Sequence, residues 1–193
     1  MRKTVSELAD VQIGYQSRGS IHPDPRGTHK VIQLKDIGND YKLDTSDLYK
    51  IIPEREPDRY LVTCGDVLFL SRGRYHVSVV IDEQLSDTIA VGTFYILRVK
   101  SSHVLPEYMA WYINQPQTQA ELKTKAQATN IPLITIAAFR DLEIDIPPLS
   151  IQHSIVELTR LVSKEQSLLA KLAKKRELLT SVICMMAAKR TRE

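Results

Sequence analysis

The sequence predicts an α+β protein. We expect a globular domain over residues 1–148, with a mainly antiparallel sheet and short helices, followed by one long C-terminal α-helix over residues 149–193 that forms an antiparallel coiled coil. Two observations support this prediction. Residues 31–100 alternate short β-rich runs with turns, whereas residues 150–189 contain no glycine or proline and repeat apolar residues every three or four positions.

The strands are expected within residues 31–100. The β-rich runs recur roughly every 8–12 residues and are separated by Gly, Pro, Asn and Asp, a spacing that indicates a mostly antiparallel sheet. The runs are VIQLKDI, LYKII, RYLVT, DVLFL, VSVVID and IAVGTFYILRV.

Helical structure is expected next. Pro106 suits the first turn of a helix, and Pro116 interrupts the helical stretch because proline cannot donate a backbone N–H. A short strand, NIPLITI, follows. The segment LEIDIPPLS then leads to Pro147 and Pro148, which end whatever precedes them.

Residues 150–189 predict a single helix, with Ser150 as the cap of its first turn. About 40 helical residues extend roughly 60 Å, which is longer than a small domain is wide. Ten positions spaced alternately by three and four are apolar in eight cases, the pattern of a coiled-coil seam. These seam positions are Ile155, Leu158, Val162, Glu165, Leu169, Leu172, Arg176, Leu179, Ile183 and Met186.

The two charged seam positions favour an antiparallel homodimer. If two copies pair about a centre between Ala170 and Lys171, Glu165 of one copy lies opposite Arg176 of the other. A parallel pair would instead place like charges opposite each other. Other registers, and a helix folded back on its own domain, are the alternatives.

Composition is that of a globular protein. The 193 residues are 43% hydrophobic, and no stretch approaches the roughly 18 uninterrupted apolar residues that a membrane span requires. The N-terminus lacks the apolar block of a signal peptide, so we expect a cytoplasmic protein without membrane contact. Cys64 and Cys184 lie far apart in different contexts, which argues against a disulfide framework or a CxxC metal site, and we expect two buried thiols.

Charge is distributed unevenly along the chain. Residues 1–149 carry 17 basic and 19 acidic residues, whereas residues 150–193 carry 9 and 4. The front part is therefore not a basic protein. If it binds nucleic acid, it does so through a local basic patch.

Several segments occur in the order seen in one protein family. They are LADVQIGYQSRGS, VIQLKDI, YLVTCGDVLFLSRG and TNIPLITIAAFRDLEIDIPPLSIQ, followed by the long helix. On these segments the chain resembles a target-recognition module, with its following helix, of type I restriction–modification specificity subunits. That family usually carries two modules and two antiparallel helices, so the chain resembles a half-sized subunit that dimerises. One departure is Ile151-Gln152, where the family often has Glu-Gln.

The resemblance implies a protein without catalytic residues, metal or cofactor of its own. Its partners would be double-stranded DNA, a DNA methyltransferase subunit and, in the larger assembly, a restriction subunit. Each module of a homodimer would read one half-site in the major groove. The paired helices would set the number of unread base pairs between the half-sites.

Three polar segments with basic residues are candidates for DNA contact. Arg72 and Arg74 in the loop after DVLFL are the strongest, because arginine can engage guanine O6 and N7 or a phosphate. The alternatives are a solvated hairpin loop for residues 71–76 and a helix C-terminus for residues 123–130. The full set of candidates is Arg18, Arg26, Lys30, Lys35, Ser71, Arg72, Arg74, Tyr75, His76, Lys123, Lys125, Gln127, Thr129 and Asn130.

A coiled-coil adaptor without a DNA role is a second hypothesis. The acidic front part and the long helix motivate it. The basic residues on the outer face of the helix are then solubilising, although the same face suits contact with methyltransferase subunits or with DNA. These residues are Lys164, Lys171, Lys174, Lys175 and Lys189.

A Cys/His hydrolase is a third hypothesis. Cys64, Ser71 and His76 are residue types that serve as nucleophile or base, and Asp66 and Asp82 lie nearby. No GxSxG elbow, Walker loop or dinucleotide fingerprint accompanies them in the sequence. A core thiol and a surface imidazole are the alternative interpretation.

Overall fold

The computed structural model describes residues 1–38, 40–73, 75–127 and 131–190. The chain divides into two compact units, Met1–His153 and Ser154–Glu193. We call the first the globular unit. The second contains most of the long helix.

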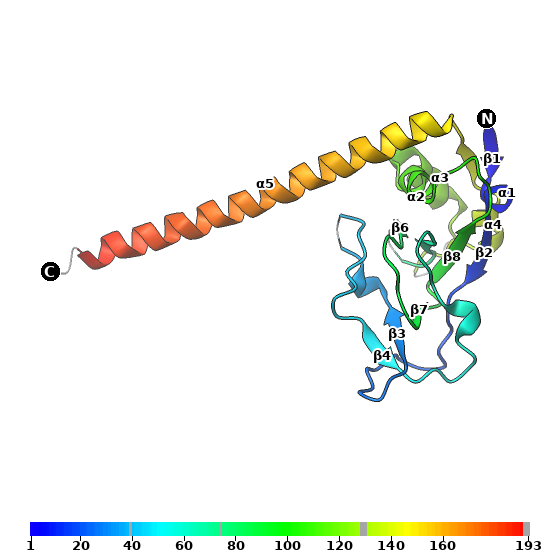
Figure 1. Ribbon diagram of the computed structural model, residues 1–193, viewed down its shortest axis with the longest axis horizontal. Helices are drawn as coiled ribbons and strands as arrows, with labels where there is room; N and C mark the ends of the chain where they lie inside the picture. Colours follow the sequence, from blue (N-terminus) through cyan, green and yellow to red (C-terminus); the bar gives the residue numbers. More distant parts are fainter. Residues whose placement is uncertain (39, 74, 128–130, 191–193) are drawn as a thin grey trace. The chain divides into compact units, whose positions relative to one another are not determined.

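A four-stranded antiparallel sheet lies in the middle of the globular unit (Figure 1). Its strand order is β2 (Ala9–Ile13), β8 (Phe94–Val99), β5 (Val67–Leu70) and β6 (Ser78–Val80). All four residues of β5 are buried, because this strand is central and both of its faces are covered.

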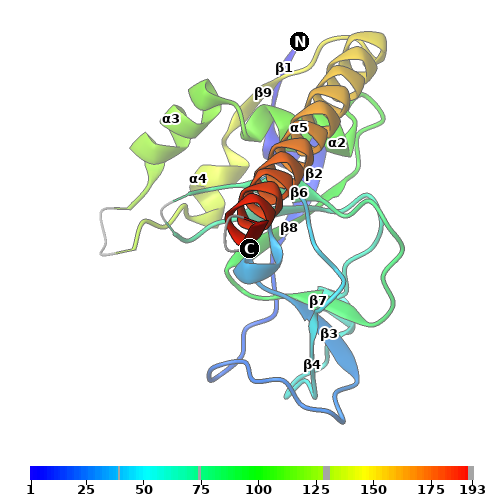
Figure 2. The same cartoon turned by 90° about the vertical axis from the view of Figure 1, so that its left-hand side faces the viewer.

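A three-stranded sheet forms the end of the globular unit opposite the short helices (Figure 2). It has the order β4 (Tyr49–Ile51), β3 (His29–Ile32) and β7 (Thr88–Ala90). The β3–β7 pair is parallel, whereas all other strand pairs among the described residues are antiparallel.

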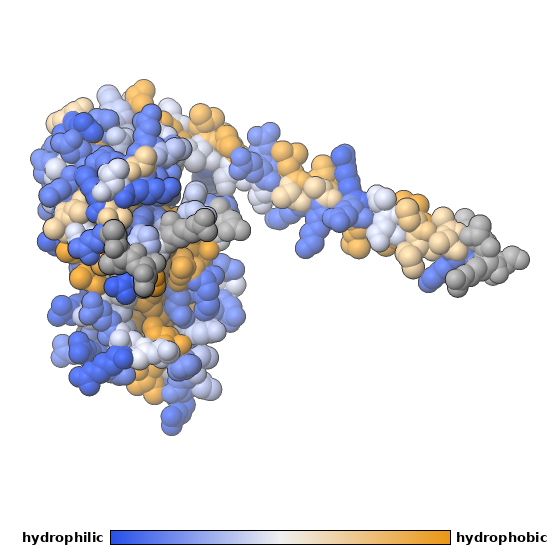
Figure 3. Space-filling view, turned by 180° about the vertical axis from the view of Figure 1, so that it is seen from behind, coloured by the Kyte–Doolittle hydropathy of each residue, from blue (hydrophilic) through white to orange (hydrophobic). Residues whose placement is uncertain are grey.

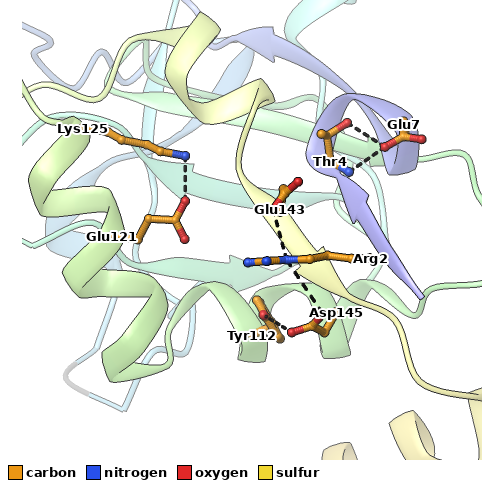
Figure 4. A network of polar contacts seen from close by, with 8 residues as sticks. All are labelled: Arg2, Thr4, Glu7, Tyr112, Glu121, Lys125, Glu143 and Asp145. Carbon is orange, nitrogen blue, oxygen red and sulfur yellow. Dashed lines mark hydrogen bonds and ion pairs between the residues drawn. The ribbon is translucent and has the colours of Figure 1, made fainter.

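The N-terminal strand is tied to the segment before the long helix. β1 (Arg2–Thr4) pairs with β9 (Glu143–Asp145), and Arg2 Nε lies 3.1 Å from Glu143 Oε2 and 3.9 Å from Asp145 Oδ1 (Figure 4). Tyr112 donates a hydrogen bond to Asp145 Oδ2 at 3.0 Å. Beside β1, the short helix α1 (Val5–Leu8) begins where Thr4 N donates to the Glu7 carboxylate at 2.7 Å. The start of the chain is thereby held against the end of the globular unit.

The core lies on both faces of β5. On one face, Leu68 and Leu70 pack with Ile32 of the three-stranded sheet. On the other, Phe69 stacks on Phe139 with ring centroids 3.9 Å apart. The helices of the unit cover this second face: α2 (Pro106–Ile113), α3 (Pro116–Lys125) and α4 (Ile136–Arg140).

The long helix α5 spans Leu149–Arg190. Its first turn is fixed by Gln152, which is fully buried, accepts from Leu105 N at 2.9 Å and donates to the carbonyls of His103 and Pro147 at 2.8 Å. The helix begins at Leu149, so Ser150, predicted as the cap, lies inside its first turn. Among the described residues, no helix combines the length and the apolar character needed to cross a membrane.

The predicted fold class is confirmed as mixed α+β with antiparallel sheets and a long C-terminal helix. Several of the predicted strands differ from the observed elements. RYLVT is not a regular strand, because Arg59 and Tyr60 belong to the 3₁₀ turn η2 (Asp58–Tyr60) and Leu61 forms an isolated antiparallel bridge to Ile89. VIQLKDI leaves the sheet after Ile32 to form the 3₁₀ turn η1 (Leu34–Asp36). Asp36 causes this exit, because its carboxylate accepts from Gln33 N at 2.7 Å. The run IAVGTFYILRV splits into β7 and β8 at a turn closed by Phe94 N and Val91 O.

Both cysteines are exposed, so the prediction of buried thiols is wrong. Cys64 lies in a turn in which Asp66 N donates to Thr63 O at 3.0 Å and Gly65 adopts a φ of +90°. This turn directs residue 64 away from the sheet before β5 begins. Cys184 lies on α5.

Candidate nucleic-acid interface

The loop between β5 and β6 is anchored at its first residue. Ser71 Oγ and Ser71 N both donate to Thr93 O, at 2.8 and 2.9 Å, and Ser71 O accepts from Ile134 N at 2.9 Å. The Ser71 side chain is 2% exposed. Ser71 therefore holds the loop in place and its hydroxyl is not available at the surface.

The other end of the loop is anchored by His76. Its ring stacks on Phe69, Nδ1 lies 3.1 Å from Leu70 O, and Gln119 Nε2 donates to His76 O at 2.7 Å. Burial lowers the pKa of His76, which favours the neutral imidazole. The structure thus places the side chains of Ser71 and His76 as buried supports of the loop rather than at its surface.

Between these anchors the loop presents exposed side chains. Arg72 is exposed, and its guanidinium forms no hydrogen bond or ion pair with another described residue, although its backbone bridges to Leu133. Gly73 N donates to Pro132 O at 3.0 Å with a φ of +134°, a conformation that favours glycine. Tyr75 is 65% exposed. The other predicted arginine, Arg74, lies outside the described residues.

A cleft of about 500 Å³ borders Arg72. Its walls come from residues 13–21, from Ser71 and Arg72, and from the turn at residues 91–93. Ser17 and Gly19 line the cleft on either side of Arg18 in the sequence, and Arg18 itself is exposed. The structure therefore brings the segments of two predicted contacts, Arg18 and Arg72, to one cleft.

A second cleft of about 430 Å³ borders the same loop at Gly73 and Tyr75. It is lined by Leu34, Tyr41 and Tyr75 among others, and these three side chains are 52%, 51% and 65% exposed. Tyr41 has a φ of +59°, which is uncommon for an aromatic residue. Aromatic and apolar side chains at such a position can contact thymine methyl groups or sugars.

The third predicted segment is joined to the loop through residues 131–134. Gln127 N donates to Leu133 O at 3.0 Å, and Leu133 also bridges to Arg72. Tyr95 Oη fixes this connecting segment by donating to Ile134 O at 2.7 Å. The structure thus brings the neighbourhoods of Arg72 and Gln127 together, although they are more than 50 residues apart in the sequence.

The lysines of that segment differ in their availability. Lys123 is exposed, whereas Lys125 Nζ pairs with Glu121 Oε1 at 2.7 Å (Figure 4). Both lie in the last turn of α3, as the helix C-terminus alternative predicts. Thr129 and Asn130 lie outside the described residues.

The remaining candidates, Arg26, Lys30 and Lys35, lie elsewhere in the globular unit, and two of them have a carboxylate within 4 Å. Arg26 Nε lies 3.6 Å from Asp24 Oδ1 and Lys30 is half-buried on β3. Lys35 Nζ lies 2.7 Å from Asp36 Oδ1 and 3.9 Å from the centre of the Tyr49 ring. The hydrogen bond to Asp36 raises the pKa of Lys35. The charge of Lys35 is thus partly compensated, so Lys35 is a weaker phosphate ligand than Arg72.

Some cleft residues were not predicted from the sequence. Gln16, Ser17 and Thr93 line the first cleft and carry polar groups. A signal for this segment is Gly14, where a Cβ atom would lie 2.5 Å from the carbonyl oxygens of Ala90 and Val91. Glycine permits the close approach that sets residues 15–17 beside residues 91–93.

The structure does not assemble the residues considered for a hydrolase. The Ser71 hydroxyl is used by Thr93 O and the His76 ring by Leu70 O and Phe69. Cys64 is exposed in its turn. No group of three or more His, Cys, Asp or Glu side chains suited to a metal ion occurs within the described ranges.

Three solved structures share the fold. The S subunit of a type I restriction-modification system from M. genitalium is 14% identical with a TM-score of 0.58, over 89% of this chain and 41% of that chain. The HsdS subunit from Thermoanaerobacter tengcongensis is 18% identical with a TM-score of 0.58, over 89% and 39%. A chain from work on complex assembly and conformational transition of the type I R-M system is 18% identical with a TM-score of 0.62, over 88% and 39%.

The chain spans about two fifths of the length of these solved chains. A search of curated proteins finds no match. A sequence model described as the type I restriction modification DNA specificity domain matches residues 4–178, which is most of the chain. The chain therefore belongs to the family of type I restriction–modification DNA specificity domains.

Proposed function

We propose that this protein is a half-sized, non-catalytic specificity subunit that reads one half-site of a bipartite DNA target. Membership of the DNA specificity family supports the DNA-reading role. Residues 1–148 act as the recognition domain, and residues 149–193 act as the pairing and spacing helix. A homodimer then presents two identical recognition domains, and its two-fold symmetry selects a palindromic bipartite site.

The observation that carries the proposal is the exposed seam of α5. Seven apolar seam residues are between 42% and 64% exposed in the single chain. An apolar face of this extent marks a contact with another protein surface. The seven residues are Leu158, Val162, Leu169, Leu172, Leu179, Ile183 and Met186.

The partner of this seam is a second copy of α5 running antiparallel. About a centre between Ala170 and Lys171, the apolar layers pair with one another and Glu165 pairs with Arg176 of the other copy. A charged pair within an apolar seam favours one register over its neighbours. This arrangement supplies the second recognition domain that a bipartite site needs.

The recognition surface is formed around the loop between β5 and β6. Arg72 reads a base edge in the major groove, because a guanidinium fork matches guanine O6 and N7. Arg18, Tyr75, Lys123 and Gln127 surround it and contribute phosphate or base-edge contacts. DNA bound in this way is presented to a methyltransferase subunit and, in the larger assembly, to a restriction subunit. Those subunits perform the chemistry.

The test is co-purification of the chain with a methyltransferase subunit, followed by mapping of the methylated sites. We expect a palindromic site with a gap of fixed length. Insertion of one heptad between Ala170 and Lys171 lengthens the helix by about 10 Å, so the gap grows by about 3 base pairs while the half-site sequences stay the same. The control carries the same heptad after Glu193 and keeps the original gap.

Two results would contradict the proposal. A monomer at micromolar concentration by light scattering would exclude the homodimer. An unchanged gap after the central insertion would exclude the spacing role of α5. The adaptor hypothesis predicts a further result, in which the purified complex has no sequence-dependent affinity for DNA.

A further inference from the structure

The helix α5 carries a second surface besides its apolar seam. We call it the lysine stripe and define it as Lys164, Lys171, Lys174 and Lys175. All four lysines are exposed, and none pairs with a carboxylate of another described residue. Arg160 continues the stripe by one turn, where it lies 3.6 Å from Glu157. In the space-filling view, hydrophilic and apolar residues alternate along this helix (Figure 3).

The lysine stripe and the seam lie on different faces of the helix. Successive residues turn by about 100°, which places the centre of the stripe about 135° from the centre of the seam. Pairing through the seam therefore leaves the four lysines accessible. Between residues 158 and 176 the one acidic residue is Glu165, and it belongs to the seam. The charged residues of the stripe face are thus all cationic over this length.

The antiparallel pairing brings two stripes together. A two-fold axis that relates two antiparallel helices runs perpendicular to the plane containing them, so both stripes lie on the same side of the pair. Residues 164–175 of one copy lie beside residues 166–177 of the other in the register given above. Lys164, Lys171 and Lys175 of both copies therefore lie on one side of the dimer within about 20 Å, and Lys174, about 160° from the seam, lies at the outer edge of each helix.

We propose that the lysine stripe binds the phosphate backbone of the unread DNA between the two half-sites. This inference rests on the proposed function, because the gap exists only if a dimer reads a bipartite site. Duplex DNA carries one negative charge per about 1.7 Å, so 20 Å of duplex offers about 12 phosphates to the six lysines on that side and to the two Lys174 residues at its edges. Lysine is a point charge that binds phosphate without reading a base, which suits a segment whose sequence is not recognised.

The lysine stripe gives α5 two roles in the same dimer. The seam sets the distance between the recognition domains, and the stripe holds the DNA that spans this distance. Contacts to the gap raise the affinity for every DNA sequence equally, so they leave the choice of half-sites to the globular unit.

The test compares the complex with the methyltransferase subunit in three forms: wild type, K164Q/K171Q/K174Q/K175Q, and the matched control K164R/K171R/K174R/K175R. Glutamine and arginine keep the helix propensity of lysine. The logarithm of the binding constant for a duplex with both half-sites is measured against the logarithm of the salt concentration. We expect the glutamine variant to lose about 0.9 from the slope for each lysine that touches a phosphate, and the arginine variant to keep the wild-type slope.

A second measurement locates the contact on the DNA. Neutral methylphosphonates replace the phosphates of the gap alone, after the target has been mapped. We expect this DNA to bind the wild-type complex more weakly than unmodified DNA, and to bind the glutamine variant as well as unmodified DNA does. Mapped half-sites are expected to be the same for all three forms.

An unchanged salt slope in the glutamine variant would overturn the inference. Loss of the methyltransferase subunit from that variant, with the slope unchanged, would also overturn it and would assign the lysine stripe to a protein partner. The proposed function fails in a different way: the wild-type complex would then show no preference for the mapped site over unrelated DNA. These readouts separate the two failures.

Discussion

The globular unit buries its apolar side chains, whereas the helix α5 leaves many of them exposed. In the globular unit, Leu68, Phe94 and Ile96 are fully buried by residues that are distant in the sequence. On α5, Leu158, Leu169 and Leu179 are each more than half exposed. The globular unit therefore contains its own core, whereas α5 displays apolar side chains that its own chain leaves exposed.

Because of this difference, substitutions in the two regions are expected to change different properties, namely the stability of the globular unit and the assembly of the chain. A substitution in the core of the globular unit changes the free energy of unfolding of that unit, because it disrupts packing inside the unit. The same kind of substitution on the α5 seam is expected to weaken the proposed dimer instead. Four predictions test this comparison.

The largest expected effect is that of Phe139→Ala. The Phe139 ring is fully buried and stacks on Phe69 at 3.9 Å, so its removal leaves a cavity and lowers the free energy of unfolding by about 3–5 kcal/mol. Urea unfolding followed by the fluorescence of Trp111, the single tryptophan, measures this change. The matched control Leu179→Ala on α5 is expected to leave the Trp111 transition within about 0.5 kcal/mol of wild type. Equal shifts in the two variants would contradict the comparison.

The second prediction concerns the charged layers of the seam. Glu165→Arg alone and Arg176→Glu alone each place like charges opposite one another in the antiparallel pair, and we expect each to weaken the dimer at least tenfold. The double variant restores opposite charges and is expected to recover wild-type affinity. In a parallel pair the double variant would still have two like-charge layers. Sedimentation equilibrium of the three variants therefore distinguishes the two orientations.

These two regions also differ in how far the sequence predicts them. The helix α5 and its exposed face follow from a local pattern, because an apolar repeat every three to four residues needs no knowledge of distant contacts. The division of the strands into separate sheets does not follow from a local pattern. β3 pairs with β7, more than 50 residues later, and nothing in either segment specifies that partner.

The candidate interface shows the same limit. Arg72 could be predicted as an exposed loop arginine from its place between two strands. The burial of Ser71 and His76 could not, because it depends on Thr93, Phe69 and Gln119, which come from other parts of the fold. A polar loop residue near a core can therefore be a support or a contact, and only its partners in the fold decide between the two roles.

The third prediction tests whether an exposed residue of the globular unit, Arg72, contributes to base recognition without contributing to stability. Arg72→Ala is expected to leave the free energy of unfolding within about 0.5 kcal/mol of wild type, because the side chain is exposed. Discrimination against a wrong base in the half-site is expected to fall by about 1–3 kcal/mol, that is, about fivefold to 150-fold. Methylation rates on single-base variants of the mapped site measure this loss.

Arg72→Lys is the matched control for that prediction. Lysine keeps the charge but lacks the planar fork. If Arg72 reads a base, the lysine variant loses discrimination nearly as much as the alanine variant. If the lysine variant keeps wild-type discrimination, Arg72 binds phosphate and the base-reading role is wrong.

The smallest expected effect is the pH dependence caused by His76. Burial, with the positive charge of Lys123 as a smaller contribution, lowers the pKa of His76 in the folded chain, while its hydrogen bond to Leu70 O acts in the opposite direction. In the unfolded chain this pKa returns to about 6.5. Below that pH the unfolded chain binds more protons than the folded one, so the free energy of unfolding falls as the pH is lowered.

The measurement is the urea midpoint of the Trp111 transition between pH 7.5 and pH 5.5, a range above the titration of most carboxylates. Above about pH 6.5 the contribution of His76 is complete, and below it the loss approaches at most about 1.4 kcal/mol per pH unit for one proton. His76→Asn retains a donor for Leu70 O without a titrating group, so we expect this variant to be less stable at pH 7.5 but to show a flatter pH dependence. If the urea midpoint of this variant depends on pH as steeply as that of wild type, another group titrates. The buried end of the loop then does not depend on a neutral His76.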